Sequence, residues 1–540
     1  MKRYADRAIL LAGLAGLLMA LSFPLGPPLP ITAHDGWWPI GWCCLAPLIL
    51  AAAVAPSALC ALTAGFSSGV VAYGLVLSWL FPFLVRWGGL QAPVAFAVLA
   101  ALVAYVAGFC AIFALCVWMW SRRWGLGRAV VLAPAAWTGL ELVRAHLLTG
   151  FPWSLLGYSQ YRVPAAIQVA DLTGIYGVSF VLVCASGIVA LICRRVARQP
   201  GTAGSRPAGF LLGAVVGSAL LYGVVRPAFL PALRQDIPVA LVQTDVAQAE
   251  KWDPAERARI EREHFEMTRA AGREGAKLVI WSESSVPVSI TADPGYATRL
   301  RDLATETGAE IVVGSVAFGS EGPQRHPLNS AFLVRPGQGV AGRYDKRRLV
   351  PFGEYVPLKK LLFFLQPLVE AASDFHAGTG ANLLASGHGA IGPLICYDAI
   401  FPGLARDSVR EGAQMLVNIS NDAWYAGTAM PYQDLAQSAL RAVECRRYLL
   451  RSANVGFSAF VDPSGVIVQR GDLGRSLVLK SSIGASTTMT PYVVLGDVFA
   501  AGCAILTAFA LALASQRVRR KPPQDQGRQT MMLSGGKDAR

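Results

Sequence analysis

Charged residues are scarce in this chain. Asp, Glu, Lys and Arg make up 15% of the 540 residues, whereas they make up about a quarter of a typical soluble domain. Acidic residues are scarcest in the first part, where the stretch from Ala8 to Leu230 contains only Asp35, Glu141 and Asp171. A water-exposed surface of this length needs many more charges, so the composition excludes an ordinary soluble domain here and indicates membrane segments.

The sequence also lacks the patterns that bind metals. Its six His are scattered and no Cys-x-x-Cys pair occurs, so we expect no metal site and no cofactor. Most of the ten Cys lie in apolar segments, where they read as small packing side chains. Only Cys396 and Cys445 lie between 228 and 490, and a disulfide between them stays open in an oxidising compartment.

Long apolar runs, by contrast, are frequent. A helix needs about 20 apolar residues to cross a bilayer. We expect eight spans, at about 8–24, 38–55, 57–83, 92–120, 127–147, 172–193, 209–227 and 491–515. The first is short, and a cleaved signal peptide is its alternative; because no clear cleavage site follows it, we favour a retained span.

The formal net charge is +14, and the excess lies beside the apolar segments. Basic residues gather before the first span, at 121–128, at 194–206 and in the tail after 515. The positive-inside rule places these stretches and both termini in the cytoplasm, which puts the block 228–490 on the periplasmic side of a bacterial inner membrane. Such a distribution is a topology signal, so we expect no nucleic-acid partner.

These patterns divide the chain into four parts. We expect a membrane part at 1–227 with seven spans, an exported block at 228–490, a transmembrane helix at 491–515 and a basic cytoplasmic tail at 516–540.

Strand-like and helix-like segments alternate in the exported block. Apolar runs bounded by turn residues predict strands, and longer stretches with helical periodicity predict helices. The expected strands lie at 237–246, 277–283, 310–318, 329–336, 339–346, 390–398 and 414–422, with a closing hairpin at 456–470 and helices at 256–276, 401–412 and 431–451. This mixture predicts an α/β domain with two sheets and outer helices.

Three of these segments end on residues with complementary chemistry. Glu283 ends "LVIWSE", Lys346 ends "VAGRYDK", and Cys396 lies in "LICYD". Strand ends in α/β folds converge on one crevice, where a carboxylate can act as base, a cysteine as nucleophile and an ammonium as oxyanion holder. A lone buried cysteine is more often an inert core residue, so the prediction depends on all three. The helix expected from about 401, and Lys346 if near, would lower the pKa of the thiol.

Glu, Lys and Cys in this order, each at a strand end, resemble the Glu-Lys-Cys triad of the nitrilase superfamily. Longer phrases resemble the apolipoprotein N-acyltransferase family through nearly the whole chain. They are "GFPWSLLGYSQY" (150–161), "KWDP" (251–254), "YDKRRLVPFGEYVPL" (344–358), "LICYD" (394–398), "SNDAWY" (420–425) and "RAVECRRYLLRSANVG" (441–456).

This resemblance implies a nitrilase-like α-β-β-α sandwich carried by a membrane helix bundle. It implies transfer of an acyl chain from a membrane phospholipid to the α-amino group of diacylglyceryl-cysteine on an apolipoprotein, through a thioester on Cys396. The partners are then the phospholipid donor, the apolipoprotein acceptor and the membrane, and we expect a monomer.

The resemblance also implies supporting roles. Glu354 matches the family's second glutamate, which would orient Lys346 or Glu283; a solvated loop acid is its alternative. The main-chain N–H of Tyr397 would hold an oxyanion. Asp398 would support the site, at a position where family members often have Glu.

Three aromatic residues match family positions around the acyl or head-group pocket. They are Trp252, Trp424 and Tyr425. Tryptophans in loops near a membrane are also frequent interfacial anchors, so both interpretations stay open.

Two functions from other classes are alternatives. A membrane-bound nitrilase-like amidase would use the same triad with water as acceptor, although seven spans exceed what a tether needs. A transporter with an inactive exported domain would leave the triad without a purpose.

Two further segments carry expectations. Glu141 and Arg144 stand three residues apart inside an apolar run, a spacing that allows an ion pair on one helical face. Residues 357–375 contain two lysines and an apolar cluster, and we expect a membrane-dipping arm that admits lipid, with a core helix as the alternative.

Overall fold

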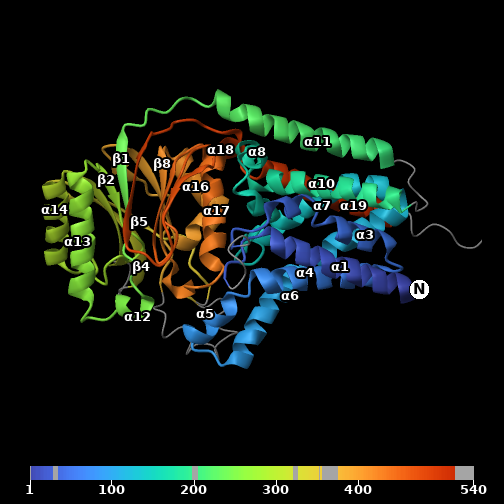
Figure 1. Cartoon of the computed structure of the whole chain (residues 1–540), viewed down its shortest axis with the longest axis horizontal. Helices are drawn as coiled ribbons and strands as arrows, with labels where there is room; N and C mark the ends of the chain where they lie inside the picture. Colours follow the sequence, from blue (N-terminus) through green and yellow to red (C-terminus); the bar gives the residue numbers. More distant parts are fainter. Residues whose placement is uncertain are drawn as a thin grey trace, which may run out of the picture.

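The computed structural model describes residues 2–27, 34–197, 205–319, 326–351, 353–355 and 375–516. Two expected segments fall almost wholly outside these ranges. The arm at 357–375 is described only at Phe375, and the basic tail at 516–540 only at Gln516. The described chain forms a bundle of helices beside a strand-rich part, along the long axis of the molecule (Figure 1).

Long apolar helices make up the bundle. Within the described residues, six of them are long and apolar enough to cross a bilayer. They are α4 (Ala58–Val76), α6 (Ala92–Trp124), α7 (Leu126–His146), α10 (Ile175–Val196), α11 (Ser205–Val225) continued by η3 (Arg226–Phe229), and α19 (Val498–Gln516). A membrane helix bundle is therefore supported by length and composition.

The remaining expected spans take other forms. The run at 8–24 lies in α1 (Lys2–Ser22), and the run at 38–55 forms η1 (Trp38–Trp42) and α3 (Ala46–Val54), which together are shorter than the six long helices. The run at 57–83 is divided between α4 and α5 (Leu80–Arg86).

The segment at 491–515 is not one helix. It forms α18 (Pro491–Leu495) and α19, which are separated at Gly496. Gly496 has φ +65°, and a Cβ there would lie 1.8 Å from Nη1 of Arg406. The break therefore depends on a residue without a side chain.

Small residues bring α4 and α6 close together. A Cβ on Gly65 would lie 2.4 Å from the main-chain oxygen of Cys110, and one on Gly69 would lie 2.5 Å from the Cα of Ala107. Such contacts are typical of helix pairs in membranes, where close backbone approach supplies the packing energy.

The strand-rich part contains two six-stranded sheets. The order of the first sheet is β12-β1-β2-β3-β4-β5, and its strands are β12 (Leu477–Ile483), β1 (Ile237–Gln243), β2 (Leu278–Ile280), β3 (Glu310–Phe318), β4 (Pro327–Arg335) and β5 (Gly339–Asp345). The order of the second is β11-β10-β9-β8-β7-β6, with β11 (Ile467–Arg470), β10 (Ala459–Val461), β9 (Leu449–Asn454), β8 (Met415–Asn421), β7 (Gly389–Ile395) and β6 (Leu384–Ser386). The expected α/β domain with two sheets is confirmed.

Parallel strands occupy the centre of each sheet. β2 pairs in parallel with β1 and β3, and β8 pairs in parallel with β7 and β9, while the outer pairs are antiparallel. The carboxyl ends of β2, β7, β8 and β9 are followed by the residues of the site described below.

Apolar layers hold the domain together. Side chains such as Leu241 and Ile280 of the first sheet pack against Val417 and Leu450 of the second. α13 (Arg257–Arg273) and α14 (Pro294–Thr307) cover the outer face of the first sheet. α16 (Pro402–Arg410) and α17 (Met430–Cys445) cover the second sheet and lie between it and the bundle (Figure 1).

The helix expected at 431–451 was too long. α17 ends at Cys445, Arg446 takes a left-handed φ of +51°, and Leu449–Asn454 forms β9. The apolar run after Arg446 continues the helical pattern in sequence, but parallel pairing with β8 outweighs local propensity. Sequence analysis also missed β6 and β12, and β12 closes the edge of the first sheet beside β1.

α17 joins the two parts of the molecule through polar contacts in a buried interface. Every residue from Gln433 to Cys445 is buried. Oε1 of Gln433 accepts hydrogen bonds from Nε1 of Trp79 at 3.1 Å and of Trp153 at 2.7 Å. Its Nε2 donates to the main-chain oxygens of Pro24 and Val76, both at 2.9 Å.

Charged side chains continue this interface toward the end of α17. Oε1 of Glu444 accepts from the main-chain N–H of Ile175 at 2.9 Å, and Arg446 forms an ion pair with Asp171 at 2.7 Å. Asp171 precedes α10, so the second sheet and the bundle are fixed to each other at both ends of α17.

We predict that Gln433→Leu weakens this interface strongly. Two indole N–H groups and two carbonyl oxygens lose their partner, and each buried unpaired group costs about 1–3 kcal/mol. The free energy of unfolding should fall by about 3 kcal/mol or more, visible as a lower thermal midpoint in detergent. Gln469→Leu, at an exposed position of β11, is the matched control; equal midpoints for both variants would contradict the prediction.

Candidate active site

Glu283 lies just after β2, where the chain turns sharply. Its side chain is 7% exposed, and the next residue, Ser284, has φ +43°. The turn packs on Gly314 of β3, because a Cβ there would lie 2.4 Å from the main-chain oxygen of Ser282 and 2.8 Å from the Cα of Glu283. The missing side chain of Gly314 therefore sets where the Glu283 carboxylate stands.

Lys346 follows β5 and contacts two carboxylates. Its Nζ lies 2.9 Å from Oε1 of Glu354 and 3.4 Å from Oε1 of Glu283. Nδ2 of Asn329, on the neighbouring β4, donates to the same two oxygens at 3.1 and 2.6 Å. Burial alone would lower the pKa of Lys346, but the two carboxylates outweigh it and raise the pKa well above its ordinary value.

Glu354 is held by the loop that it belongs to. Its Oε2 accepts from the main-chain N–H of Val350 at 2.8 Å, while Oε1 faces Lys346. These contacts make Glu354 a part of the buried cluster, and the alternative of a solvated loop acid does not describe it.

Cys396 follows β7 and opens the short helix η5 (Cys396–Ile400). Its φ is +48°, in the left-handed region that side chains rarely adopt, and the residue is 8% exposed. Strained backbone of this kind persists where the surroundings over-determine it, and it is frequent at functional sites. The thiol is free, and so is Cys445, so no disulfide joins them.

The expected lowering of the thiol pKa was wrong. Burial and the nearby Glu283 carboxylate raise the pKa of the Cys396 thiol well above its ordinary value, and Lys346 offsets only part of this rise. The prediction considered the dipole of the following helix and the charge of Lys346. Desolvation of the buried thiolate has a larger effect on the pKa of Cys396. The raised pKa favours a neutral thiol at rest, and the Glu283 carboxylate is near enough to contribute to the rise.

Asp398 ties the cysteine turn to the lysine segment. Its Oδ2 accepts from the hydroxyl of Tyr344 at 2.9 Å and from the main-chain N–H of Ile395 at 3.1 Å, and Oδ1 accepts from the N–H of Arg348 at 2.8 Å. Burial raises the pKa of Asp398 to about 6. The side chain of Asp398 is shorter than that of Glu, but it still connects β5 and β7 through these hydrogen bonds.

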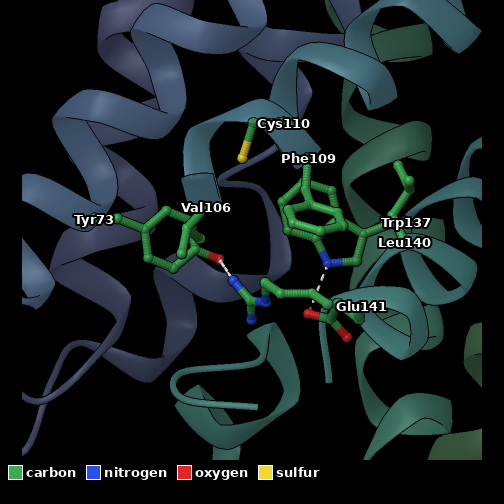
Figure 2. Close-up of a pocket in the computed structure, with 8 residues that line it drawn as sticks. Tyr73, Val106, Phe109, Cys110, Trp137, Leu140 and Glu141 are labelled. Carbon is green, nitrogen blue, oxygen red and sulfur yellow. Dashed lines mark hydrogen bonds between the residues drawn. The ribbon is translucent and has the colours of Figure 1, made fainter. Parts of the chain in front are cut away.

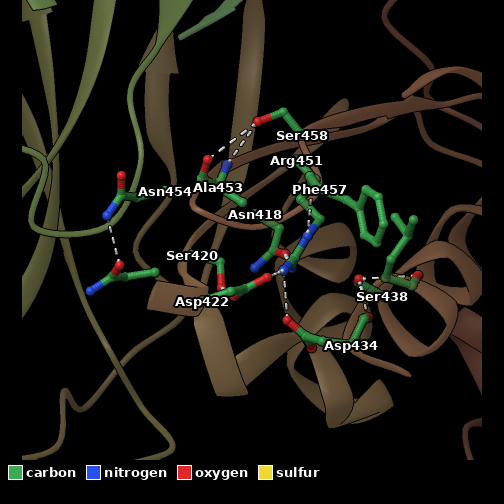
Figure 3. A network of polar contacts seen from close by, with 12 residues as sticks. Asn418, Ser420, Asp422, Asp434, Ser438, Arg451, Ala453, Asn454, Phe457 and Ser458 are labelled. Carbon is green, nitrogen blue, oxygen red and sulfur yellow. Dashed lines mark hydrogen bonds and ion pairs between the residues drawn. The ribbon is translucent and has the colours of Figure 1, made fainter. Parts of the chain in front are cut away.

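A second charged network lies between β8, β9 and α17 (Figure 3). The Arg451 guanidinium pairs with Asp422 at 2.9 Å and with Asp434 at 2.7 Å, and it also donates to Asn418. Burial raises the pKa of Asp434 to about 6, although Arg451 opposes the rise. Both carboxylates contribute to the raised pKa of the Cys396 thiol.

The three candidate aromatic residues differ in exposure. Trp252 is 51% exposed and Trp424 37%, whereas Tyr425 is buried. The ring of Tyr425 stacks on Phe83 of α5, with centroids 4.8 Å apart, and Trp424 packs edge-on against Trp87 at 5.3 Å. The bundle therefore contributes aromatic rings beside the segment that follows β8.

Glu141 and Arg144 do not form the expected ion pair (Figure 2). Arg144 donates to the hydroxyl of Tyr73 at 2.6 Å and to the main-chain oxygen of Trp153 at 3.3 Å. Glu141 accepts from Nε1 of Trp137 at 2.9 Å and from the N–H of Leu156 at 2.7 Å. Backbone groups of the loop after α7 outcompete the pairing, and the two side chains fix the loop that carries Trp153.

Comparisons with known proteins agree along the whole chain. Residues 15–188 match the apolipoprotein N-acyltransferase N-terminal domain, and residues 238–488 match the carbon-nitrogen hydrolase domain. The apolipoprotein N-acyltransferase of Geobacter metallireducens is 38% identical over 519 residues, which cover 95% of this chain and 96% of that protein. The chain belongs to the apolipoprotein N-acyltransferase family. The enzyme of that name from Pseudomonas paraeruginosa is 31% identical over 494 residues, which cover 89% of this chain and 92% of that protein.

Solved structures were also compared. An amidase from Nesterenkonia sp. is 22% identical with a TM-score of 0.35, covering 46% of this chain and 90% of its own. The family resemblance inferred from the sequence is thus confirmed, and this member of the apolipoprotein N-acyltransferase family is an acyltransferase with a carbon-nitrogen hydrolase domain.

Sequence analysis of this family member brought Glu283, Lys346, Glu354 and Cys396 together but missed other polar residues of the site. The sequence pattern identifies Asn329 only as the first residue of an expected strand. An amide side chain at the start of an apolar strand is a signal that could have indicated its place in the site. Asp422, Asp434 and Arg451 appear in or near the quoted phrases, yet their network joins three separate elements.

We predict that Gly314→Ala lowers acyl transfer by about 10-fold or more, because a shift of about 1 Å in a reacting group can cost about 100-fold. The new Cβ would displace the turn that carries Glu283, although the variant removes no polar side chain from the site. Activity of the purified full chain is the measurement. Gly319→Ala, beyond the other end of β3 and with its nearest contact at 3.4 Å, should be near normal; equal losses in both variants would refute the explanation.

Proposed function

We propose that this enzyme transfers an acyl chain from a membrane phospholipid to the N-terminal amino group of diacylglyceryl-cysteine in apolipoproteins, through a thioester on Cys396. The supporting observation is the buried cluster of Glu283, Lys346 and Glu354 beside a strained cysteine, in a domain that is docked on apolar helices. The names of the relatives support the acceptor.

In the first half of the reaction, Glu283 takes the proton of the Cys396 thiol and the thiolate attacks the ester carbonyl of the phospholipid. The Lys346 ammonium and the main-chain N–H of Tyr397 hold the oxyanion. When the intermediate collapses, the carbon–oxygen bond breaks and Glu283 returns its proton to the leaving lysophospholipid. A thioester remains on Cys396.

In the second half, the amine of the lipoprotein attacks the thioester carbonyl. Glu283 takes a proton from the nitrogen, and the carbon–sulfur bond breaks with sulfur keeping the electron pair. The proton on Glu283 then restores the neutral thiol. A raised thiol pKa suits this cycle, because the resting cysteine stays protonated until the carboxylate is in position.

The proposed setting is a bacterial inner membrane crossed by eight spans, with residues 228–490 on the periplasmic side and both termini in the cytoplasm. We assign Trp252, Trp424 and Tyr425 to the surroundings of the acyl chain or the head group, since two of them contact rings of the bundle. The enzyme acts as a monomer without a cofactor in this proposal.

We predict a lipid-derived adduct on Cys396. The purified full chain, incubated with phospholipid vesicles, should gain the mass of one fatty acyl chain on the Cys396 peptide, and hydroxylamine should remove it. Addition of a diacylglyceryl-cysteine peptide should discharge the adduct onto the peptide amine. Cys396→Ser should remain folded but lose turnover, since a hydroxyl lacks the acidity of a thiol; substantial turnover by this variant would sink the nucleophile assignment.

We predict that Lys346→Arg fails almost as severely as Lys346→Ala. A planar guanidinium cannot place its charge where the compact ammonium lies, 2.9 Å from Glu354 and, in this proposal, beside the oxyanion. Loss should exceed about 100-fold for both, the scale of losing one oxyanion donor. Near-normal rates for the arginine variant would reduce Lys346 to a general electrostatic partner.

A further inference from the structure

Lys251 is a buried lysine with no role in the steps above. It ends α12 (Gln248–Lys251) and is 1% exposed, although the next residue, Trp252, is 51% exposed. Its Nζ donates a hydrogen bond to the main-chain oxygen of Glu283 at 2.8 Å. The ammonium therefore lies against the same strained turn that carries the proposed base.

Within the part of the chain that the structure describes, the charge of Lys251 has no direct counter-ion. Among the described residues no carboxylate oxygen lies within 4.0 Å of its Nζ, whereas Lys346 contacts two carboxylates. A buried cation without a partner is costly, and a group with a perturbed pKa beside a reactive cluster is a candidate functional residue. Burial lowers the pKa of Lys251 to about 8, and the negative charges of Glu283 and the Cys396 thiolate limit the fall.

The loop that carries Lys251 is fixed by the second sheet. Asn454, at the end of β9, exchanges two hydrogen bonds of 2.8 Å with the main chain of Val246. Asn421, at the end of β8, donates to Gln248 at 2.9 Å. Lys251 and Cys396 are thus both positioned by carboxyl ends of the second sheet, and this fixed placement is what an electrostatic role requires.

We propose that Lys251 is a second cation of the active site, a positioning residue that holds the Glu283 turn and stabilises the Cys396 thiolate. In the step concerned, the S–H bond breaks, the proton moves to the Glu283 carboxylate and sulfur keeps the electron pair. No other reactant is needed. The assignment deepens the proposed function and rests on it for the meaning of that thiolate.

Other charged groups face the same site, and their charges also affect how the alkylation rate of Cys396 depends on pH. The carboxylates come from the turn after β2, the loop after β5, η5, η6 (Asp422–Tyr425) and α17: Glu283, Glu354, Asp398, Asp422 and Asp434. The cations are Lys346 and Arg451, and His264 of α13 stays neutral because burial lowers its pKa to about 4. Removal of Lys251 therefore leaves a more negative surrounding for the thiol.

Alkylation of Cys396 tests this assignment without lipid. The full chain in detergent is treated with iodoacetamide between pH 6 and pH 10, and the Cys396 peptide is quantified by mass spectrometry. Lys251→Met and Lys251→Gln remove the charge, while glutamine keeps a hydrogen-bond donor. Lys251→Arg keeps the charge, and Lys277→Met, exposed at the opposite end of β2, is the control.

We expect both neutral variants to slow alkylation of Cys396 about tenfold at pH 7, where wild-type Lys251 is charged, and to match the wild-type rate above pH 9, where it is not. The arginine and control variants should stay close to wild type at pH 7. Wild-type alkylation rates at pH 7 in folded Lys251→Met and Lys251→Gln would overturn the assignment.

If thermal melting shows that the neutral variants are unfolded, Lys251→Arg tests the proposal instead. Above pH 9 lysine with a pKa of about 8 has lost its charge and arginine keeps it. Cys396 should then react at least about twofold faster in Lys251→Arg than in wild type, and equal rates would overturn the proposal. Slower alkylation of the neutral variants at pH 7 without any lipid adduct on wild-type Cys396 would refute the proposed function alone; an adduct with unchanged alkylation rates would refute the role of Lys251 alone.

Discussion

The chemistry of the site depends on one buried ammonium group. Lys346 lies between the carboxylates of Glu283 and Glu354, which come from different loops and would repel each other without it. In a medium of low dielectric constant such repulsion is strong. The ammonium, together with the amide of Asn329, lets the two carboxylates share one small volume. Removal of this cation would leave the two carboxylates facing each other without the charge that separates them.

The two sheets contribute different residues to this charged site. The first sheet supplies Glu283 and Lys346 from the ends of β2 and β5, and the second supplies Cys396 from the end of β7. Asp398 then links the sheets by accepting from Tyr344 and Ile395. Because the second sheet is also fixed through α17 to the bundle, the position of Cys396 and that of the apolar helices are determined together.

Sequence patterns predicted the parts of the site that depend on local order. Glu283, Lys346 and Cys396 each end an apolar run, and period and turn residues were enough to place them at strand ends. The errors came from interactions between distant residues. The i, i+3 spacing of Glu141 and Arg144 suggested a pair, but Trp153 and Leu156 supply nearer partners. The strand at 449–454 was read as helix because its pairing with β8 is invisible in sequence.

The thiol pKa shows the same limit in a different way. A following helix and a nearby lysine are both sequence features, and both lower a thiol pKa. Burial depends on what packs around the residue, which here is the apolar layer between the two sheets. Desolvation is the larger effect, so the fold converts a cysteine that sequence would make acidic into one that stays protonated at rest.

Protonation at rest has a consequence for the choice of acceptor. In the proposed cycle the thioester must wait for an amine in the presence of water, which an amidase would use instead. Cys396 is 8% exposed and packs in the apolar layer between the two sheets, with Ile280, Tyr344 and Tyr448. In this proposal the buried position of the sulfur restricts the access of water to an acyl carbon bonded to it. Burial of the thiol would then select against hydrolysis, and the triad itself need not differ from that of a hydrolase.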